Sequence, residues 1–428
     1  MNQSDWNINI IYEWNKGMDE KVQHVFLVGA KGLGNYGGYE TFIDKLTEYH
    51  QNKKQIKYHV ACKANGDGYT DETKLNDVER LSDTEFQYHN AHCFKIRVPE
   101  KIGAAQAIYY DLAALKRSCQ IIREMNISTP IVYILACRIG PFVQIFYNEI
   151  HRLGGRIFLN PDGHEWRREK WSILIRKYWR FSERLMVKYS DLVICDSINI
   201  EKYIHDSYDK KGIKKANPYT VFIAYGAEIR KSLLPDKNEK YIEWMKSKEL
   251  QPYKYYLVVG RFVPENNYET MIREFMECDS KKFLVIISNV NERFLNQLEN
   301  RLHFKKDSRI KFAGTVYDQE LLMKIRENAF GYFHGHEVGG TNPSLLEAMG
   351  STDLNMLLDV SFNREVAEDT ALYWNKTKNS LSRLIESVDN MSDSERKSWG
   401  TKAKKRIQNA YSWEYISTKY AETFLNKF

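Results

Sequence analysis

Short runs rich in β-branched and aromatic residues alternate with helical patterns from residue 21 almost to the end of the chain. Such alternation predicts parallel sheets covered by helices. A first series of predicted strands covers residues 22–29, 57–62, 93–98, 131–135, 156–160, 192–196 and 220–224. A second series covers residues 255–260, 283–288, 310–314, 331–334 and 355–359. The expected fold class is therefore α/β, with two Rossmann-like domains whose parallel sheets face an interdomain cleft and bind ligands at the carboxyl ends of their strands.

The length of 428 residues also favours two domains, because it exceeds what one ordinary core supports. We expect an N-terminal extension over 1–20, a first domain over 21–228 and a second domain over 254–410. Residues 229–253 are the expected connector, since a charged run lies there between Pro235 and Pro252. The last segment, 411–428, contains a predicted amphipathic helix. Its apolar stripe consists of Trp413, Ile416, Tyr420 and Phe424.

Several classes of protein are disfavoured by what the sequence lacks. The longest apolar runs, such as residues 131–137 and 255–260, are far shorter than the roughly 18 residues of a transmembrane helix. The N-terminus does not show the charged-then-apolar pattern of a signal peptide. Six scattered cysteines without a C-x-x-C pair indicate buried thiols in a reducing cytosol. The pairs His334–His336 and His89–His92 have no partner cluster with metal-site spacing, so we expect no metal.

A glycine-rich loop follows the first predicted strand. Gly32, Gly34 and Gly37 spell G-x-G-x-x-G between a strand and a helix, the arrangement that lets backbone amides approach a pyrophosphate. The second strand ends at Lys63 instead of the acid that binds a ribose, and a lysine suits a 2′-phosphate. An NADP-dependent oxidoreductase is therefore one interpretation, and a tight turn without ligand is another. A third is that Gly37 and Gly38 open a helix that helps to bind a sugar donor.

The segment from Phe333 to Gly350 contains the most informative motif. A strand ends near His334, and Asn342-Pro343 is typical of an N-cap followed by proline at the first helical position. Free amides of Ser344 and its neighbours would then form an anion site suited to the diphosphate of a nucleotide sugar. Glu347, about one turn further, can accept two ribose hydroxyls. Arg261, just past another strand end, can neutralise the departing diphosphate.

Four segments, 36–42, 160–171, 260–267 and 339–349, together resemble glycosyltransferase family 4. The closest likeness is to the bacterial rhamnosyltransferases that build cell-wall and capsule polysaccharides. The resemblance implies a GT-B fold, retention of anomeric configuration, no required metal or other cofactor, and a final helix that crosses back to the first domain. It also implies an acceptor-side first domain and a nucleotide-sugar-binding second domain. The donor residues it implies are Arg261, Gly340, Thr341, Asn342, Ser344 and Glu347.

The resemblance further implies dTDP-L-rhamnose as donor and a polyprenyl-diphosphate-linked glucose or N-acetylglucosamine as acceptor. Two positions depart from the family pattern. Gly339 stands where the family usually has a glutamate, so Glu337 becomes the candidate for holding the donor sugar. Asn266-Asn267 replaces a common lysine. Because this glutamate is missing, a non-catalytic subunit with a transferase fold is an alternative to both a transferase and an NADP-dependent oxidoreductase.

The acceptor side is predicted around the Pro-Asp-Gly turn at Asp162. A turn aspartate is an ordinary structural feature, but a carboxylate at a strand end can also assist or position a reacting hydroxyl. We therefore take Asp162 as a catalytic candidate beside Arg261 and Glu337. The acceptor-binding candidates are Glu40, His164 and Arg167.

A strongly basic helix is predicted within residues 164–189, which hold eight of the lysines and arginines against three acids. One stripe consists of Trp171, Leu174, Tyr178, Phe181 and Leu185, and a neighbouring stripe of Lys177, Arg180, Arg184 and Lys188. The helix is either a core helix with a solvated basic flank or a helix that rests on anionic lipid. Without a recognisable DNA or RNA module, nucleic acid is not expected. We favour a cytoplasmic protein attached peripherally to the inner face of the cell membrane.

Overall fold

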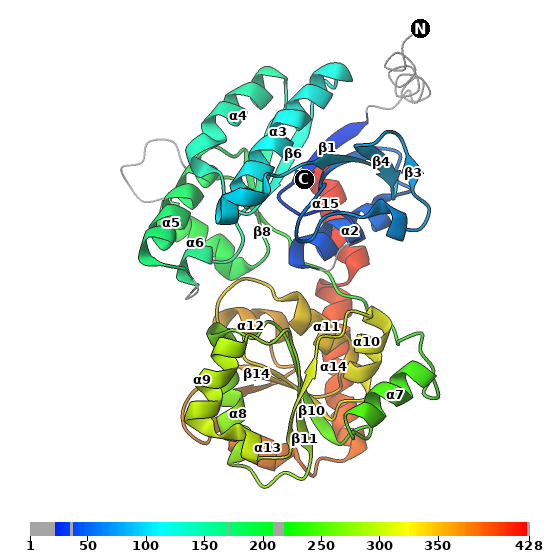
Figure 1. Ribbon diagram of the computed structural model, residues 1–428, viewed down its shortest axis with the longest axis vertical. Helices are drawn as coiled ribbons and strands as arrows, with labels where there is room; N and C mark the ends of the chain where they lie inside the picture. Colours follow the sequence, from blue (N-terminus) through cyan, green and yellow to red (C-terminus); the bar gives the residue numbers. More distant parts are fainter. Residues whose placement is uncertain (1–21, 35–36, 169–170, 209–217, 426–428) are drawn as a thin grey trace. The chain divides into compact units, whose positions relative to one another are not determined.

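The computed structural model describes residues 22–34, 37–168, 171–208 and 218–425, so the predicted extension over 1–20 lies outside the described residues. Two compact units make up the chain (Figure 1). Unit 1 extends from the first described residues to Trp166 and includes Ile173–Ile223 and the C-terminal residues from Ile416. Unit 2 comprises Ala224–Tyr415 and the described residues of Arg167–Ser172.

Unit 1 is built on a nine-stranded sheet in the order β3-β4-β5-β2-β1-β6-β7-β8-β9. The strands are β1 Gln23–Val28, β2 Ile56–Lys63, β3 Glu79–Arg80, β4 Glu85–Tyr88, β5 Ala91–Ile96, β6 Ile131–Leu135, β7 Arg156–Asn160, β8 Leu192–Cys195 and β9 Thr220–Phe222. All pairs are parallel except those of β4, which is antiparallel to β3 and β5. Every strand of the first predicted series is present, and two additional strands, β3 at the edge and β4 beside it, extend the sheet.

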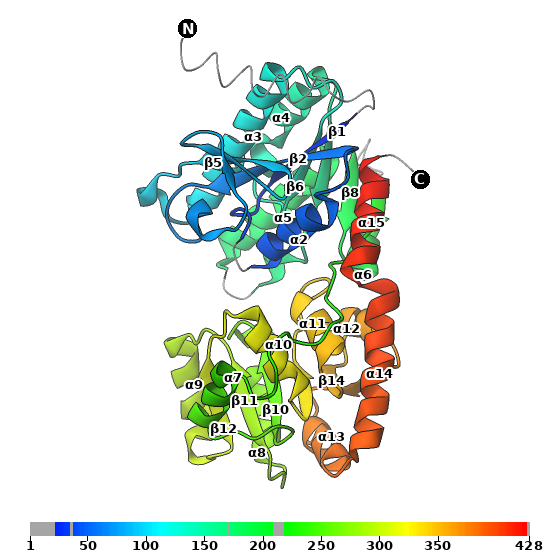
Figure 2. The same cartoon turned by 90° about the vertical axis from the view of Figure 1, so that its right-hand side faces the viewer.

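The helices of unit 1 are α2 Gly38–His50, α3 Gln106–Glu124, α4 Gly140–Arg152, α5 Ile173–Lys188, α6 Ile198–Tyr208 and α15 Trp413–Phe424, with short 3-10 turns at Glu72–Lys74, Glu100–Ala105 and Glu165–Arg167. The C-terminal helix α15 belongs to this unit for most of its length, as Figure 2 shows. Its buried Tyr420 hydroxyl lies 3.2 Å from that of Tyr133 on β6. The His50 Nε2 atom on α2 lies 2.8 Å from the Ser417 carbonyl oxygen. The last helix therefore completes the core that the first strands begin.

Unit 2 contains a six-stranded parallel sheet in the order β12-β11-β10-β13-β14-β15. Its strands are β10 Tyr255–Val259, β11 Phe283–Ile287, β12 Ile310–Gly314, β13 Gly331–His334, β14 Asn355–Leu358 and β15 Leu372–Trp374. The helices are α7 Glu239–Ser247, α8 Tyr268–Met276, α9 Glu292–Leu302, α10 Gln319–Glu327, α11 Pro343–Ser351, α12 Ser361–Ala367, α13 Ser380–Val388 and α14 Asp393–Ala410, with 3-10 turns at Pro264–Asn266 and Phe304–Lys306. The second predicted series is present, and β15 is additional.

The strand orders fix where each sheet can bind a ligand. In unit 1 the connections reverse direction between β1 and β6, and in unit 2 they reverse between β10 and β13. Loops that leave the carboxyl ends of such neighbouring strands diverge to opposite faces, and the gap between them is the usual ligand site of an open α/β sheet.

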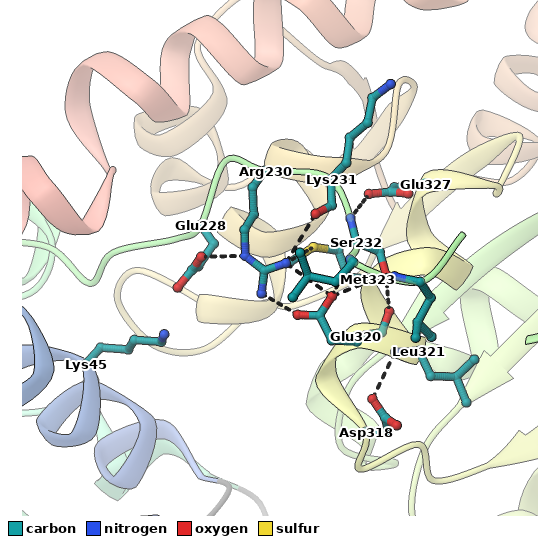
Figure 3. Close-up of polar contacts among 12 residues, drawn as sticks. Lys45, Glu228, Arg230, Lys231, Ser232, Asp318, Glu320, Leu321, Met323 and Glu327 are labelled. Carbon is teal, nitrogen blue, oxygen red and sulfur yellow. Dashed lines mark hydrogen bonds and ion pairs between the residues drawn. The ribbon is translucent and has the colours of Figure 1, made fainter. Parts of the chain in front are cut away.

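The segment predicted as a connector is partly helical and is tied to unit 2. Helix α7 buries Tyr241 in the core of that unit. Before it, Arg230 pairs with Glu320 at the start of α10 (Figure 3). The Ser232 hydroxyl donates to the Glu320 carbonyl at 2.8 Å, and the Leu233 amide donates to the Glu320 carboxylate at 2.6 Å. Glu320 thus fastens the segment to α10.

None of the helices in the described ranges is long and apolar enough to span a bilayer.

Candidate functional site

The loop after β10 presents Arg261 at the switch point of unit 2. The Arg261 side chain is exposed. The backbone around it is fixed by hydrogen bonds from two nearby side chains. The Asn266 Nδ2 atom donates to the Arg261 carbonyl at 2.7 Å, and the Tyr268 hydroxyl donates to the Gly260 carbonyl at 3.1 Å. An arginine on a loop fixed in this way is suited to an anionic ligand, because little order must be gained on binding.

The loop after β13 is bonded directly to the loop after β10. The Asn267 Nδ2 atom donates to the Gly335 carbonyl at 2.9 Å and to Glu337 Oε2 at 3.1 Å. The Glu337 amide donates to the Glu265 carbonyl at 3.2 Å, and its carboxylate also pairs with Lys376. One asparagine of the Asn266-Asn267 pair thus orients the candidate Glu337, and Lys376 supplies a cation that sequence reasoning did not single out.

Two glycines explain the unusual sequence of this loop. A Cβ at Gly335 would lie 2.4 Å from the Asn266 carbonyl oxygen, so the close approach of the two loops requires glycine. Gly339 has φ of 139°, a conformation that side-chain-bearing residues rarely adopt. A glutamate at position 339 would therefore strain the backbone, which gives a physical reason for its absence there.

Helix α11 begins as the sequence predicts, with Asn342 as N-cap and Pro343 in the first turn. The expectation of a free Ser344 amide is wrong, because that amide donates to Asn342 Oδ1 at 2.9 Å. The Ser344 hydroxyl donates to the Val259 carbonyl at 3.2 Å, which joins α11 to the end of β10. Thr341 is buried and Gly340 precedes it in the same turn. The first turn of α11 contains no acidic residue, so its positive dipole end keeps its attraction for an anion.

Glu347 lies further along α11 and has a partner that the sequence did not reveal. Its Oε2 atom is 2.6 Å from Nη2 of Arg326 on α10, a side chain only 4% exposed. The Glu347 side chain is 26% exposed. The predicted ribose carboxylate is therefore held from beneath by a buried guanidinium.

Two histidines line the end of β13. Burial lowers the pKa of His334 to about 3. Burial also lowers the pKa of His336 well below its usual value, and the neighbouring His334 and Arg261 lower it further. Both rings are therefore neutral at physiological pH. The His334 Nε2 atom is buried and has no hydrogen-bond partner within the described part of the chain.

In unit 1, carboxylates of α2 accept hydrogen bonds from backbone amides of the glycine-rich loop. The Lys31 amide donates to Glu40 Oε1 at 2.9 Å, and the Gly34 amide donates to Asp44 Oδ1 at 3.2 Å. Amides that would cradle a pyrophosphate are thus occupied by carboxylates of the chain itself, which argues against a dinucleotide there. Gly37 is the N-cap of α2 and Gly38 its first residue, with open space around the Gly38 Cα. Residues 35–36 lie outside the described residues, and they include the first residue of the segment 36–42.

The predicted acceptor residues follow β7. Asp162 is half-buried with φ of 58°, and its Oδ1 accepts a hydrogen bond from the Gly163 amide at 2.8 Å. This contact is that of a turn aspartate, and it leaves the second carboxylate oxygen for other contacts. The His164 ring lies 4.2 Å from that of Tyr203, and Arg167 is exposed at the end of the following 3-10 turn.

Arg138, after β6, is a functional candidate that sequence reasoning missed. Its Nη1 atom donates to the Gly29 carbonyl at 2.8 Å and lies 3.1 Å from Oδ2 of the buried Asp111. Burial by itself would lower the pKa of Arg138, but Asp111 raises it above its usual range. Its position could have indicated it, because Arg138 follows the end of the switch-point strand β6 by three residues, as Arg261 follows β10 by two.

Residues 22–228 match the family model described as a domain of unknown function, DUF1972. None of the curated proteins matches this chain in sequence. Sucrose-phosphate synthase from Thermosynechococcus elongatus is similar in structure, with a TM-score of 0.70, 14% identity, and coverage of 95% of this chain and 99% of that chain.

Two further solved structures are similar over almost the whole chain. HepE from Anabaena, in complex with UDP and glucose, gives a TM-score of 0.64 and 14% identity, covering 94% of this chain and 99% of that chain. A glycosyltransferase from Rickettsia africae ESF-5 gives a TM-score of 0.66 and 12% identity, covering 95% and 98%. With its two parallel-sheet α/β units, the chain has the GT-B fold.

Proposed function

We propose that this protein is a glycosyltransferase that uses a nucleoside-diphosphate sugar. The observation that carries the proposal is the convergence of an exposed arginine, a helix N-terminus without acidic residues and a carboxylate at the β10/β13 switch point. The fold likeness supports it, and the HepE structure contains UDP and glucose. Within the proposal the donor binds to unit 2 and the acceptor to unit 1.

The main requirement of the reaction is to stabilise the negative charge that develops on the leaving group. When the bond between the anomeric carbon and the β-phosphate oxygen breaks, that oxygen keeps the electron pair and the nucleoside diphosphate leaves. Arg261 and the positive end of α11 stabilise the developing charge. Glu337 and the turn of Gly340 and Thr341 position the sugar, and Glu347 holds the ribose. The acceptor hydroxyl then attacks, with retention of anomeric configuration.

The finer proposal is that L-rhamnose passes from dTDP-L-rhamnose to a polyprenyl-diphosphate-linked glucose or N-acetylglucosamine. It rests on the sequence resemblance to bacterial rhamnosyltransferases. Asp162 would position or deprotonate the acceptor hydroxyl, because it follows a strand of the acceptor-side unit. Glu40, His164 and Arg167 would bind the acceptor, and Gly37 and Gly38 at the start of α2 would help to bind the sugar donor.

A lipid-linked acceptor also requires a surface that meets the membrane, and we place that surface on α4 and α5. These helices pack against each other in unit 1 (Figure 1). The face of α5 that enters the core contains Ser182, Glu183, Met186 and Val187. Outward lie Ile145, Ile173, Leu174 and Phe181, exposed by 66%, 72%, 78% and 54%. We call these four residues, with the exposed Lys177, Arg180, Arg184 and Lys188, the α4–α5 face.

The α4–α5 face fits an anionic bilayer, since exposed apolar side chains can enter the headgroup region while lysine and arginine contact phosphates. Of the two interpretations of this helix, a core helix with a buried apolar stripe is contradicted at Leu174 and Phe181, which are exposed. The reason is that α5 packs through the adjacent stripe, which periodicity alone did not distinguish from it.

The test of the proposed function is direct. Purified protein is incubated with a panel of nucleotide sugars and short polyprenyl-diphosphate-linked glucose or N-acetylglucosamine, and products are identified by mass spectrometry. A product heavier by one deoxyhexose with dTDP-L-rhamnose alone would support the finer proposal. A hexose product from a UDP-sugar would support the activity and reject rhamnose. No product with any donor, together with NADPH fluorescence changes on binding, would favour an oxidoreductase.

A further inference from the structure

The contact between Arg326 and Glu347 bears on which sugar hydroxyls of a nucleoside the proposed donor site can bind. Arg326 lies on α10 with 3% of its surface exposed, and burying a cation is costly unless a counter-ion is present. Among the described residues its ion-pair partner is Glu347, whose Oε2 lies 2.6 Å from Nη2, while Nη2 and Nε have no hydrogen-bond partner there. The other oxygen, Oε1, has no hydrogen bond or ion pair in the described part of the chain, and the side chain reaches solvent.

A carboxylate can receive the two adjacent hydroxyls of a ribose on its two oxygens, one on each. In Glu347, Oε2 lies 2.6 Å from the buried guanidinium and keeps one lone pair, whereas both lone pairs of Oε1 are available. Oε1 is therefore the stronger acceptor for a sugar hydroxyl. A 2′-deoxyribose offers one ring hydroxyl near this position, the 3′-hydroxyl, whereas a ribose offers two.

We propose that Arg326 is a positioning residue that fixes Glu347 so that Oε1 receives the 3′-hydroxyl of the donor nucleoside. The site then gains little from a 2′-hydroxyl and is suited to 2′-deoxynucleoside diphosphates. This inference rests on the proposed function, since it assumes that the nucleotide binds at α11.

Helix α10, which contains Arg326, is hydrogen-bonded to neighbouring segments at both ends. These bonds fix the backbone from which the Arg326 side chain extends. At the start of α10, the Glu320 carbonyl accepts the Ser232 hydroxyl at 2.8 Å (Figure 3). At its end, the Arg326 carbonyl accepts the Thr352 hydroxyl, just after α11, at 3.0 Å. A carboxylate paired with a guanidinium on such a helix loses little freedom when a hydroxyl binds it.

The experiment measures dissociation constants by calorimetry on the full chain, using nucleotides that differ by one hydroxyl. Comparing dTDP with 2′,3′-dideoxy-TDP reports the 3′-hydroxyl, and comparing UDP with 2′-deoxy-UDP reports the 2′-hydroxyl. A hydrogen bond to a charged group corresponds to roughly a tenfold or greater change in affinity. Wild type should therefore bind dTDP at least fivefold more tightly than the dideoxy nucleotide. It should bind UDP and 2′-deoxy-UDP within fivefold of each other.

Variants assign the effect to Arg326. In R326M the 3′-hydroxyl preference should fall below about half its wild-type value, because Glu347 is no longer held. R326K retains the buried charge if R326M does not fold, and it should lose preference as well, since an ammonium lacks the planar fork of a guanidinium. K324M is the matched control, because Lys324 lies on the same helix and is similarly buried but pairs with Asp236. It should keep the wild-type preference.

The inference is overturned if wild type prefers UDP over 2′-deoxy-UDP by more than fivefold, or shows less than a fivefold 3′-hydroxyl preference. It is also overturned if folded R326K and R326M retain the full preference, or if K324M loses it equally. Failure of the proposed function gives a different result, in which wild type binds none of the four nucleotides.

Discussion

If the α4–α5 face meets the membrane, neutralising its cations should release the protein from anionic vesicles. The perturbation is the triple substitution Lys177→Gln, Arg180→Gln and Arg184→Gln, all on exposed positions of α5. Each basic residue near an anionic surface contributes about 1 kcal/mol, so losing three should weaken partitioning by roughly a hundredfold. Raising the salt should have a similar effect, because the attraction is screened.

The apolar part of the face should contribute separately. Ile173 and Leu174 are 72% and 78% exposed, so placing them in an apolar environment removes most of each side chain from water. Full burial of such a side chain is worth about 1.5–3 kcal/mol. Ile173→Ser with Leu174→Ser should therefore weaken partitioning by at least tenfold, and this loss should persist in high salt.

The assay is sedimentation with vesicles of phosphatidylglycerol and phosphatidylcholine, compared with phosphatidylcholine alone. The matched control replaces three exposed lysines of α14 in unit 2, Lys397, Lys402 and Lys405, by glutamine. It removes the same charge from another surface and should leave binding nearly unchanged. Equal binding of wild type and the α5 triple variant would refute the reasoning, and equal losses in both triple variants would assign the effect to net charge.

Three further predictions concern the site and the fold. Arg261→Ala should lower the transfer rate by about a hundredfold or more with unchanged thermal stability, because an exposed guanidinium serves leaving-group charge; steady-state kinetics test this, and a loss under threefold would remove Arg261 from the mechanism. Transfer should survive EDTA, since the GT-B resemblance implies no required metal; a strict requirement for added magnesium or manganese in the same assay would contradict it. Burial lowers the pKa of His50 to about 4 from 6.5, so the fold favours the neutral ring and stability falls as pH drops below 6.5. From pH 7.5 to pH 5 this residue should cost about 2 kcal/mol. In denaturant titrations at both pH values, His50→Gln should reduce the pH-dependent loss by that amount, and an unchanged loss would show that His50 does not titrate on unfolding.

The sequence predicted the buried strands well because both faces of a parallel sheet are covered by helices, which makes each strand a continuous apolar run. β3 and β4 were missed since they are short, and both residues of β3 are charged and exposed. The buried face of the basic helix α5 was harder to predict from the sequence. Its core face includes Ser182 and Glu183, so the most apolar stripe was not the buried one.

Candidate site residues could be selected from the sequence where topology alone places them. Arg261 follows a strand at a switch point, and Asn342 caps the helix after the neighbouring strand, so local sequence was sufficient to find both. Arg326 and Lys376 could not be found in this way. They contact Glu347 and Glu337 through the fold, and nothing in the spacing of one sequence reports such pairs.

Both units place a helix N-terminus and an arginine at the switch point of the sheet. The two switch points differ in the acidic residues around these groups. In unit 1 the first turn of α2 contains Glu40, which receives the Lys31 amide, and Asp111 neutralises Arg138. An incoming anion would meet carboxylates there. In unit 2 the first turn of α11 has no acidic residue, and Arg261 is exposed at the end of the neighbouring strand. Because the Lys31 and Gly34 amides already donate to Glu40 and Asp44, whereas the first turn of α11 has no acidic residue, we expect the donor diphosphate at the switch point of unit 2, as proposed above.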